Sequence, residues 1–465
     1  MKTKRFDFDV AIAGAGPGGT LAALRLAEAG LSVGLFDALP EVGLGRSLVL
    51  ETEPTVYSEV GLPLPSGDTV PYECARLRVL SARGRELFSF DEREHALPVA
   101  INLDVFVKGL LVQAKRAGAR FVPGTRVISA ITSGERVTGF ICKGSDGRDR
   151  HVNARITIDA TGFAAALVRS LPASFGFEFP ESSRHVVSAA NCLHRLVPAK
   201  ADAAIGNGLF APDEIIARMG TTGSYSTVYS FLSKRDGTAY LLVGLKRDHE
   251  RIITARQVVD AFVRDAGCFG TQVRAAAAPI RIRHSLDRMV AGGFMALGEA
   301  ACTVFPMHGS GVASALITAT LASGVAVNAI RGNDVSAAAL WPYAAAYQRG
   351  RGRRLAGYDV TRLTVDLLSA DDVASMLESG IMQAEDTLNG LQVNEPRISA
   401  RTVPARIRGF SAHPTLLPPI ARMGMTLRRV LDHYARYPER DDPVAFTAWC
   451  AKKKRIFGRL LEERS

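Results

Sequence analysis

A glycine-rich turn near the start of the chain places the strongest constraint on its fold. Gly14-Ala-Gly-Pro-Gly-Gly19 follows the apolar run Val10–Ala13 and opens an Ala- and Leu-rich segment that is typical of a helix. Glycines at this spacing let the backbone approach a pyrophosphate at a helix N-terminus. Asp37 ends the next apolar strand, where a carboxylate meets the ribose of an adenosine. We therefore predict a Rossmann-like α/β fold that binds a dinucleotide.

A second glycine-rich stretch, almost 300 residues later, indicates which dinucleotide. An apolar strand ends at Gly298-Glu299, and the turn from Pro306 to Val312 leads into a second helix. A carboxylate at Glu299 can accept hydrogen bonds from a ribityl chain, and the helix N-terminus stabilises negative charge on a reduced flavin. A nicotinamide dinucleotide needs only the first site, whereas the longer FAD molecule uses both. The pair of turns therefore predicts FAD.

The order of the motifs predicts four regions. Residues 1–165 form the first part of the FAD-binding domain, with a short substrate-side insertion near 70–100, and residues 286–345 form its second part. Between them, residues 166–285 carry alternating apolar patterns that predict an inserted antiparallel β domain for substrate. Residues 346–465 are predicted to be a helical extension. We expect Pro342 to kink or break a helix over 335–348.

Composition excludes several classes of protein. The net charge is +11, but aromatic residues make up only 7% and the basic residues are mostly scattered, so we expect no nucleic acid partner. The excess of positive charge is either a solvated surface or an attraction for anionic substrates, carrier proteins or lipid headgroups. The six cysteines are dispersed, which favours reduced thiols in a cytoplasmic protein over a disulfide framework or a metal site. The N-terminus runs directly into the first strand, so we expect no signal peptide.

Residues 300–330 contain no Asp, Glu, Lys or Arg. This uncharged stretch is longer than the ~20 residues that a membrane span requires. Pro306, His308 and several Gly, Ser and Thr residues interrupt the stretch, however. We predict a buried helix that faces the cofactor. A contact with the membrane surface stays open for the basic helix near 445–463, which could equally meet a carrier protein or water.

At this point the chain resembles the FAD-dependent superfamily of aromatic hydroxylases, geranylgeranyl reductases and flavin-dependent halogenases, over residues 6–345 in motif order. The resemblance implies that the first glycine turn holds the pyrophosphate, that Arg46 lies near the flavin and that Gly298-Glu299 stands for the Gly-Asp of the family. Asp159-Ala-Thr-Gly162 stands at the middle motif. The residues predicted to bind FAD are Gly14, Gly16, Pro17, Gly18, Gly19, Asp37, Arg46, Asp159, Gly162, Gly298, Glu299, Pro306, Gly309, Gly311 and Val312.

The resemblance leaves several activities open. Our first hypothesis is a monooxygenase that activates O2 at reduced FAD and oxidises a hydrophobic, aromatic or polyketide-like molecule, either free or tethered to a carrier. The alternative is a geranylgeranyl-reductase-like enzyme that reduces or forms C=C bonds. Halogenases of the family carry a WxWxIP motif and an early lysine, but this chain has only Trp341 and Trp449 and no lysine between Lys4 and Lys108. A halogenase and a non-redox flavin cyclase are therefore less favoured.

Few residues suggest acid–base chemistry beside the flavin. His308 lies in the second glycine turn and is the candidate catalytic residue, as an acid, a base or a hydrogen-bond donor; the alternative is a loop histidine that satisfies backbone groups. Tyr225, Tyr229 and Phe231 alternate on one strand and are candidates for the substrate wall. The middle motif resembles that of halogenase and cyclase relatives, which suggests a separate flavin reductase, although direct reduction by NAD(P)H stays open.

Overall fold

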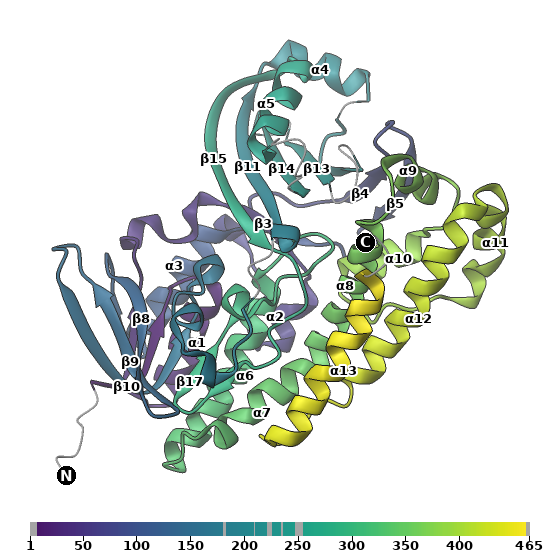
Figure 1. The fold of residues 1–465 in the computed structure, drawn as a ribbon. Coiled ribbons are helices and arrows are strands. Elements are labelled where there is room, and N and C mark those ends of the chain that lie inside the picture. The colour runs from purple at the N-terminus through teal and green to yellow at the C-terminus, as the bar shows by residue number, and fades with distance from the viewer. Residues whose placement is uncertain are drawn as a thin grey trace, which may run out of the picture.

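A computed structural model describes residues 7–179, 183–208, 210–220, 226–233, 236–246 and 254–461. Its first layer is a sheet in the order β16-β17-β10-β1-β2-β7, in which β17, β10, β1, β2 and β7 are parallel (Figure 1). The strands are β1 (Phe8–Ala13), β2 (Val33–Phe36), β7 (Arg120–Val122), β10 (Asp149–Asp159), β16 (Val290–Ala291) and β17 (Phe294–Ala296). The antiparallel strands β8 (Arg126–Ser133) and β9 (Arg136–Lys143) extend the first half of β10. The predicted Rossmann-like fold is confirmed.

Three helices pack together against this sheet. They are α1 (Pro17–Glu28), α3 (Leu103–Arg116) and α6 (Val312–Arg331). Leu21 and Leu24 of α1 and Leu316 of α6 belong to one apolar core with the strands. Among the described residues, α6 is the helix whose length and composition would suit a membrane span, yet 61% of that stretch is buried inside the protein. Its apolar sequence thus serves the core, as predicted.

A second sheet has the order β15-β11-β14-β13-β12-β4-β5 and stands above the first (Figure 1). Its strands are β4 (Arg76–Leu80), β5 (Glu86–Asp91), β11 (Val186–Leu196), β12 (Glu214–Met219), β13 (Ser226–Ser233), β14 (Thr238–Lys246) and β15 (Phe269–Arg281). Neighbouring strands are antiparallel except β12 and β4. The insertion near residues 70–100 therefore joins the substrate sheet as β4 and β5. Helix α5 (Ala255–Ala266) contacts β11, β14 and β15, and a ribbon of β3 (Val49–Thr52) with β6 (Val99–Asn102) lies between the layers.

The C-terminal region is helical, as predicted. Its helices are α7 (Ala337–Tyr347), α8 (Arg353–Val365), α9 (Ala370–Glu378), α10 (Ala384–Leu391), α11 (Val403–Ala412), α12 (Leu417–Tyr434) and α13 (Pro443–Leu461). The break expected at Pro342 does not occur, because α7 continues through it with the proline ring exposed. The irregular turn begins six residues later, where Gln348–Gly352 forms a π-helical turn before α8. In α13 the apolar face is buried, including Trp449 and Phe457.

Buried charges join these helices to the rest of the protein. Asp359 of α8 accepts hydrogen bonds from His284 Nδ1 at 2.7 Å and from Arg362 at 2.7 and 2.8 Å. The Arg362 guanidinium holds the pKa of Asp359 well below its usual value despite burial. Lys453 of α13 pairs with Asp287, in the loop after His284. Each charge has a partner, which buried charges require, so α8 and α13 are fixed against the chain that leads into β17.

Candidate functional site

The predicted motifs meet at one edge of the parallel sheet. In register, Phe36, Ala13, Asp159 and Ala296 lie side by side at the carboxyl ends of β2, β1, β10 and β17. The chain segments that follow these ends are Asp37, the first glycine turn, the Ala-Thr-Gly motif and Gly298-Glu299. Ligands of open α/β sheets bind at this edge. The parallel pairing therefore assembles motifs that are up to 285 residues apart in sequence.

Glycine is required in the first turn for steric reasons. Gly14 has φ +100°, and a Cβ there would lie 2.3 Å from the carbonyl oxygen of Ala160. A Cβ at Gly19 would lie 1.9 Å from the carbonyl oxygen of Gly14. Gly16 differs, because a Cβ there would meet nothing within 4 Å and Gly16 lines the central cavity. Gly14 and Gly19 thus shape the turn, whereas Gly16 keeps space open above it.

Two helix N-termini converge on this space. A Cβ at Gly18 of α1 would lie 3.0 Å from the carbonyl oxygen of Ala315 in α6, and one at Gly298 would lie 3.3 Å from the Ala315 Cβ. The first turns, Pro17–Gly19 and Val312–Ser314, contain no acidic side chain. Each end carries partial positive charge and unpaired backbone N–H groups. The pair forms an environment for anionic groups.

A cavity of about 570 Å³ extends from these helix ends to the second sheet. Ligand pockets in proteins are commonly of this size, about 300–1,000 Å³. Predicted FAD contacts in its wall are Gly16, Pro17, Gly18, Gly19, Arg46, Gly162, Gly298, Glu299, Gly309, Gly311 and Val312. The opposite wall is aliphatic and includes Leu77, Val187, Ala189, Ala190, Ile215, Leu242, Val243, Gly244, Ala276, Ala277, Ala278, Ile280 and Leu391. One end of the cavity is thus polar and glycine-rich, and the other is apolar.

Glu299 lies where the polar end meets the substrate sheet. Its Oε1 accepts a hydrogen bond from the backbone N–H of Arg281 at 2.9 Å, and its Oε2 would lie 3.9 Å from a Cβ on Gly162. Burial raises the pKa of Glu299 to about 7, although the nearby charges of Arg281 and Arg46 lower it. Arg46, in a left-handed backbone conformation with φ 51°, lines the same cavity. The structure therefore brings Arg46, Gly162 and Glu299 together.

Four of the predicted FAD residues are not part of the cavity wall: Gly14, Asp37, Asp159 and Pro306. Asp37 accepts hydrogen bonds from Ala15 N and Leu39 N, both at 2.7 Å, at the outer end of the glycine turn. Asp159 is fully buried and accepts four hydrogen bonds from its own loop, from the Thr161 N–H and hydroxyl and from Leu167 N and Val168 N. Because its oxygens are used in this way, Asp159 does not contact FAD directly as predicted. It instead holds the loop that carries the Ala-Thr-Gly motif.

His308 has the geometry of the alternative that the sequence allowed, a histidine that satisfies the backbone. Its Nδ1 accepts a hydrogen bond from Ser310 N at 3.3 Å, and its ring stacks on Phe305 with centroids 4.1 Å apart. Burial and the charge of Arg351 lower its pKa to about 3. The ring lines the cavity but is neutral, and its Nδ1 is engaged by the backbone, so it is poorly suited to acid–base catalysis.

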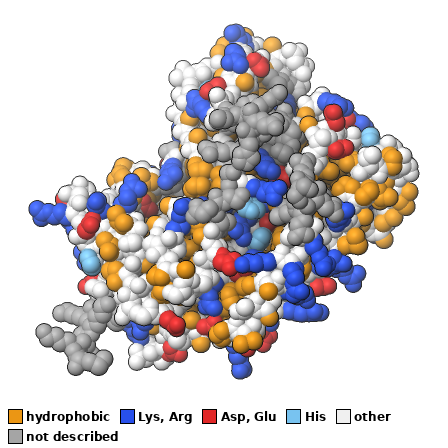
Figure 2. Space-filling model, in the orientation of Figure 1, with side chains coloured by type: hydrophobic (Ala, Val, Ile, Leu, Met, Phe, Trp, Pro, Cys, Tyr) orange, Lys and Arg blue, Asp and Glu red, His pale blue; other side chains and the backbone are white. Residues whose placement is uncertain are grey.

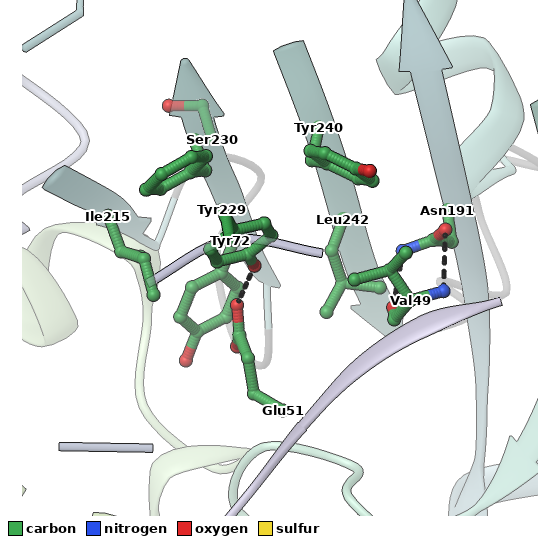
Figure 3. A pocket seen from close by; sticks show the side chains of 10 residues that line it. Val49, Glu51, Tyr72, Asn191, Ile215, Tyr229, Ser230, Tyr240 and Leu242 are labelled. Atoms are coloured by element: carbon green, nitrogen blue, oxygen red, sulfur yellow. Dashed lines mark hydrogen bonds between the residues drawn. The ribbon is translucent and has the colours of Figure 1, made fainter. Parts of the chain in front are cut away.

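The apolar end of the cavity contains a part-buried carboxyl group that sequence reasoning missed, Glu51 on β3 (Figure 3). Tyr72 donates a hydrogen bond to Glu51 Oε1 at 2.8 Å. Burial raises the pKa of Glu51, and the hydrogen bond from Tyr72 lowers it. No motif surrounds Glu51 in the sequence, and the only signal for it is a charged residue directly after the apolar Val49 and Leu50.

The predicted substrate residues divide into three cases. Tyr229 lines the cavity near Glu51, whose charge adds to the effect of burial in raising the pKa of Tyr229. Phe231 is buried and stacks on Tyr72, with ring centroids 3.9 Å apart, and it lines only a small recess beside the cavity. Tyr225 lies outside the described residues.

This site fits FAD on its own geometry. Gly16 leaves open space beside a helix N-terminus, which suits a pyrophosphate. The N-terminus of α6 suits the electron-rich pyrimidine edge of a flavin. The second carboxylate oxygen of Glu299 faces Gly162, where it can accept a hydrogen bond from a ribityl hydroxyl. Asp37 retains acceptor capacity for the adenosine ribose.

Comparison with known proteins identifies the family and supports the fold. Residues 7–334 match the family model described as FAD binding domain. The sequence is 22% identical to the digeranylgeranylglycerophospholipid reductase of Sulfolobus acidocaldarius, over 96% of both chains. A geranylgeranyl bacteriochlorophyll reductase-like protein from Thermoplasma acidophilum has a TM-score of 0.69 and 18% identity, covering 90% of this chain and 99% of that one. Aklavinone-11 hydroxylase in complex with FAD and aklavinone has a TM-score of 0.56 and 17% identity, covering 83% and 73%. These structural likenesses show the fold alone, and the predicted superfamily is confirmed.

Gly16→Ala is expected to weaken FAD binding about tenfold or more without unfolding the protein. The added methyl group meets no protein atom within 4 Å and so occupies only the space for the ligand; a tenfold effect corresponds to ~1.4 kcal/mol. Titration of FAD into the stripped protein, with thermal unfolding of the stripped protein, tests this. Gly109→Ala, on an exposed position of α3 with equal open space, is the matched control. Normal affinity in Gly16→Ala would contradict the assignment.

FAD binding is expected to strengthen as pH rises through about 7, because the ionised Glu299 is the better acceptor for a hydroxyl. Affinity should rise about tenfold for each unit by which bound FAD lowers this pKa, and Glu299→Gln should remove the dependence. In the stripped protein the free energy of unfolding should change with pH in the opposite direction, falling as pH rises. The folded pKa lies above the ordinary value of 4.5, so the contribution of Glu299 is full below about 4.5 and is lost as pH rises through about 7. The exposed Glu135→Gln is the control, and a pH-independent Kd in the wild type would refute the assignment.

Proposed function

Since the chain belongs to the FAD binding domain family, we propose that it is an FAD-dependent reductase that saturates C=C bonds in the isoprenoid chain of a lipid. A reductase of a digeranylgeranyl lipid is similar to it over 96% of both chains. The monooxygenase hypothesis is not confirmed by this relative, whereas the alternative, C=C reduction, is supported by it. FAD-dependent oxidoreduction is common to both.

The observation that carries the proposal is a part-buried carboxyl group, that of Glu51, at the aliphatic end of the cavity. A long hydrocarbon chain can be desolvated against Leu242, Val243 and the alanines of β15. Small residues on this wall leave room for the chain above the sheet. Reduction of an alkene needs both a hydride and a proton, whereas flavin oxygenation needs little acid–base machinery from the protein. A proton donor in an aliphatic pocket therefore favours reduction.

Reduced FAD, when bound, supplies the hydride to one alkene carbon. The other carbon must receive a proton, and Glu51 is the group placed to hold it. The carbonyl oxygen of Glu51 accepts a hydrogen bond from Ser310 Oγ at 3.0 Å, which fixes β3 to the glycine turn before α6. Its side chain reaches the apolar end, where Leu242 and Tyr229 line the same space (Figure 3). Glu51 thus lies between the flavin-binding turn and the substrate sheet.

The surroundings of Glu51 keep it in place and favour its protonated form. Tyr72 donates to Oε1 and is held flat against Phe231 by ring stacking. Asn191 clamps the same strand, donating to Val49 O at 2.8 Å and accepting from Val49 N at 3.4 Å (Figure 3). With Oε1 occupied, the proton of the neutral carboxyl group is carried on Oε2, free to be donated. After transfer, the carboxylate is stabilised by the Tyr72 hydroxyl until it takes a proton from water.

Anaerobic single turnover tests the activity. The FAD-loaded enzyme, reduced with dithionite, should be reoxidised by a geranylgeranyl lipid, and the product should gain two hydrogens per double bond. Dithionite makes the assay independent of the natural donor, NAD(P)H or a separate reductase. In D2O both hydrogens added to each double bond should be deuterium, because the proton of the acid and the N5 hydrogen of reduced flavin both exchange with solvent. Flavin that is reoxidised only by O2, with oxygen incorporated into an added substrate, would refute the proposal in favour of the monooxygenase.

Glu51→Gln is expected to slow reoxidation by the alkene 10²–10⁴-fold, the usual contribution of a general acid, while FAD affinity and reduction by dithionite stay unchanged. The wild-type rate should fall as pH rises through the raised pKa of Glu51, because only the protonated form donates. Glu51→Gln should lose that limb of the profile. Glu59→Gln, an exposed carboxyl at the end of the short helix α2 (Thr55–Glu59), is the control. An unchanged rate and profile in Glu51→Gln would exclude it as the acid.

A further inference from the structure

The hairpin of α11 and α12 presents apolar side chains to solvent. Figure 2 shows hydrophobic side chains gathered on the right of the molecule, where Figure 1 places this hairpin. Ile407 and Met425 are each more than half exposed, at 58% and 57%. Other exposed apolar residues of the hairpin and the segment before it are Ile398, Val403, Pro404, Pro414, Leu417 and Pro418. Apolar groups gathered in this way mark an interaction site more often than isolated ones do.

The charge around these side chains has one sign. From Arg397 to Leu431 the sequence has seven arginines and no Asp or Glu. Arg401, Arg408, Arg428 and Arg429 are exposed, whereas Arg406 is engaged with Asp386. Exposed apolar side chains with arginines beside them are typical of helices that lie in the interface of an anionic bilayer, where the apolar groups enter the acyl boundary and the cations meet phosphate.

We propose that the α11–α12 hairpin docks the protein on an anionic lipid bilayer and inserts Ile407, Leu417 and Met425 into it. This surface rests on the proposed function, since a reductase of membrane lipids must take its substrate from a bilayer. It differs from the surface that the sequence suggested. The basic C-terminal helix α13 has its apolar face packed inside the protein, with Trp449 and Phe457 buried, so it presents mainly polar groups outside.

The hairpin is connected to the wall of the cavity. Arg406 of α11 binds both carboxylate oxygens of Asp386 at 2.8 Å, and Asp386 is in the first turn of α10. Leu391, at the end of α10, lines the aliphatic end of the cavity. A Cβ on Gly409 would lie 2.9 Å from the carbonyl oxygen of Ser379, so α11 also packs closely on the end of α9. A bilayer under the hairpin would therefore lie beside the element that closes the substrate end.

Vesicle flotation of the FAD-loaded full-length protein tests the proposal. The wild type should bind vesicles of phosphatidylglycerol and phosphatidylcholine, and binding should weaken with salt and be much weaker on phosphatidylcholine alone. The double variant Ile407→Ser/Met425→Ser should reduce binding about tenfold or more. Val42→Ser/Val444→Ser, at residues that are 81% and 80% exposed elsewhere, is the matched control and should bind as the wild type does.

Three outcomes would overturn the proposal: no binding of the wild type to anionic vesicles, equal loss in both double variants, or a wild-type dimer that Ile407→Ser/Met425→Ser converts to a monomer without affecting vesicle binding. Binding is measured without turnover, so it can succeed even if the proposed reaction fails. If both the docking and the proposed reaction are right, the Ile407→Ser/Met425→Ser enzyme should catalyse reduction of a detergent-dispersed lipid at the normal rate. It should catalyse reduction of a vesicle-embedded lipid more slowly. A properly folded variant is verified by its flavin spectrum.

Discussion

The close packing of α1 on α6 is the constraint on which the rest of the structure depends. Gly18 of α1 and Gly298, in the turn after β17, both lie close against Ala315 of α6: an added Cβ would lie 3.0 Å from the Ala315 carbonyl oxygen or 3.3 Å from the Ala315 Cβ. This contact brings the N-termini of two helices, almost 300 residues apart in sequence, to the same edge of one sheet. Their partial positive charges then act on one ligand. A side chain at Gly18 would therefore push α1 and α6 apart at their N-terminal ends.

The substrate sheet and the C-terminal helices close the space that this edge opens. The alanines of β15 and Gly244 of β14 form a wall of small side chains, and Leu391 of α10 completes it. The buried pairs of Asp359 with His284 and of Lys453 with Asp287 hold α8 and α13 against the chain leading into β17. The Lys453–Asp287 ion pair adds little net stability but penalises alternative packing, because either partner alone would be an unpaired charge. His284, whose pKa burial lowers to about 4, is neutral and acts through its hydrogen bond to Asp359. The cavity thus has a polar end fixed by the core and an aliphatic end fixed by attached layers.

The sequence predicted correctly the motifs whose backbone can adopt only one conformation. It was less informative about the roles of single side chains. Gly14 and Gly19 are dictated by close backbone contacts, so their spacing carries its own structural meaning. Asp159 and His308 occupy motif positions, yet their polar atoms are used by neighbouring backbone groups. Glu51 has no motif, and its chemistry arises from Tyr72, from Ser310 and from an aliphatic wall contributed by distant strands. Whether the polar atoms of such a side chain remain free to bind a ligand depends on the residues that surround it in the folded structure.

The sequence by itself determined the Rossmann-like fold, the two glycine turns, the FAD family and the helical C-terminal region, because local periodicity and backbone sterics are written in adjacent residues. The tertiary structure alone decided which polar groups face the cavity and which faces of the helices remain exposed. The helices α13 and α12 both contain apolar and cationic residues, and both bury an apolar face, through Trp449 and Phe457 in α13 and through Val430 and Tyr434 in α12. In α12, however, Leu417 and Met425 remain exposed outside that face. That difference depends on packing between helices, and packing surfaces are fixed only when the chain has folded.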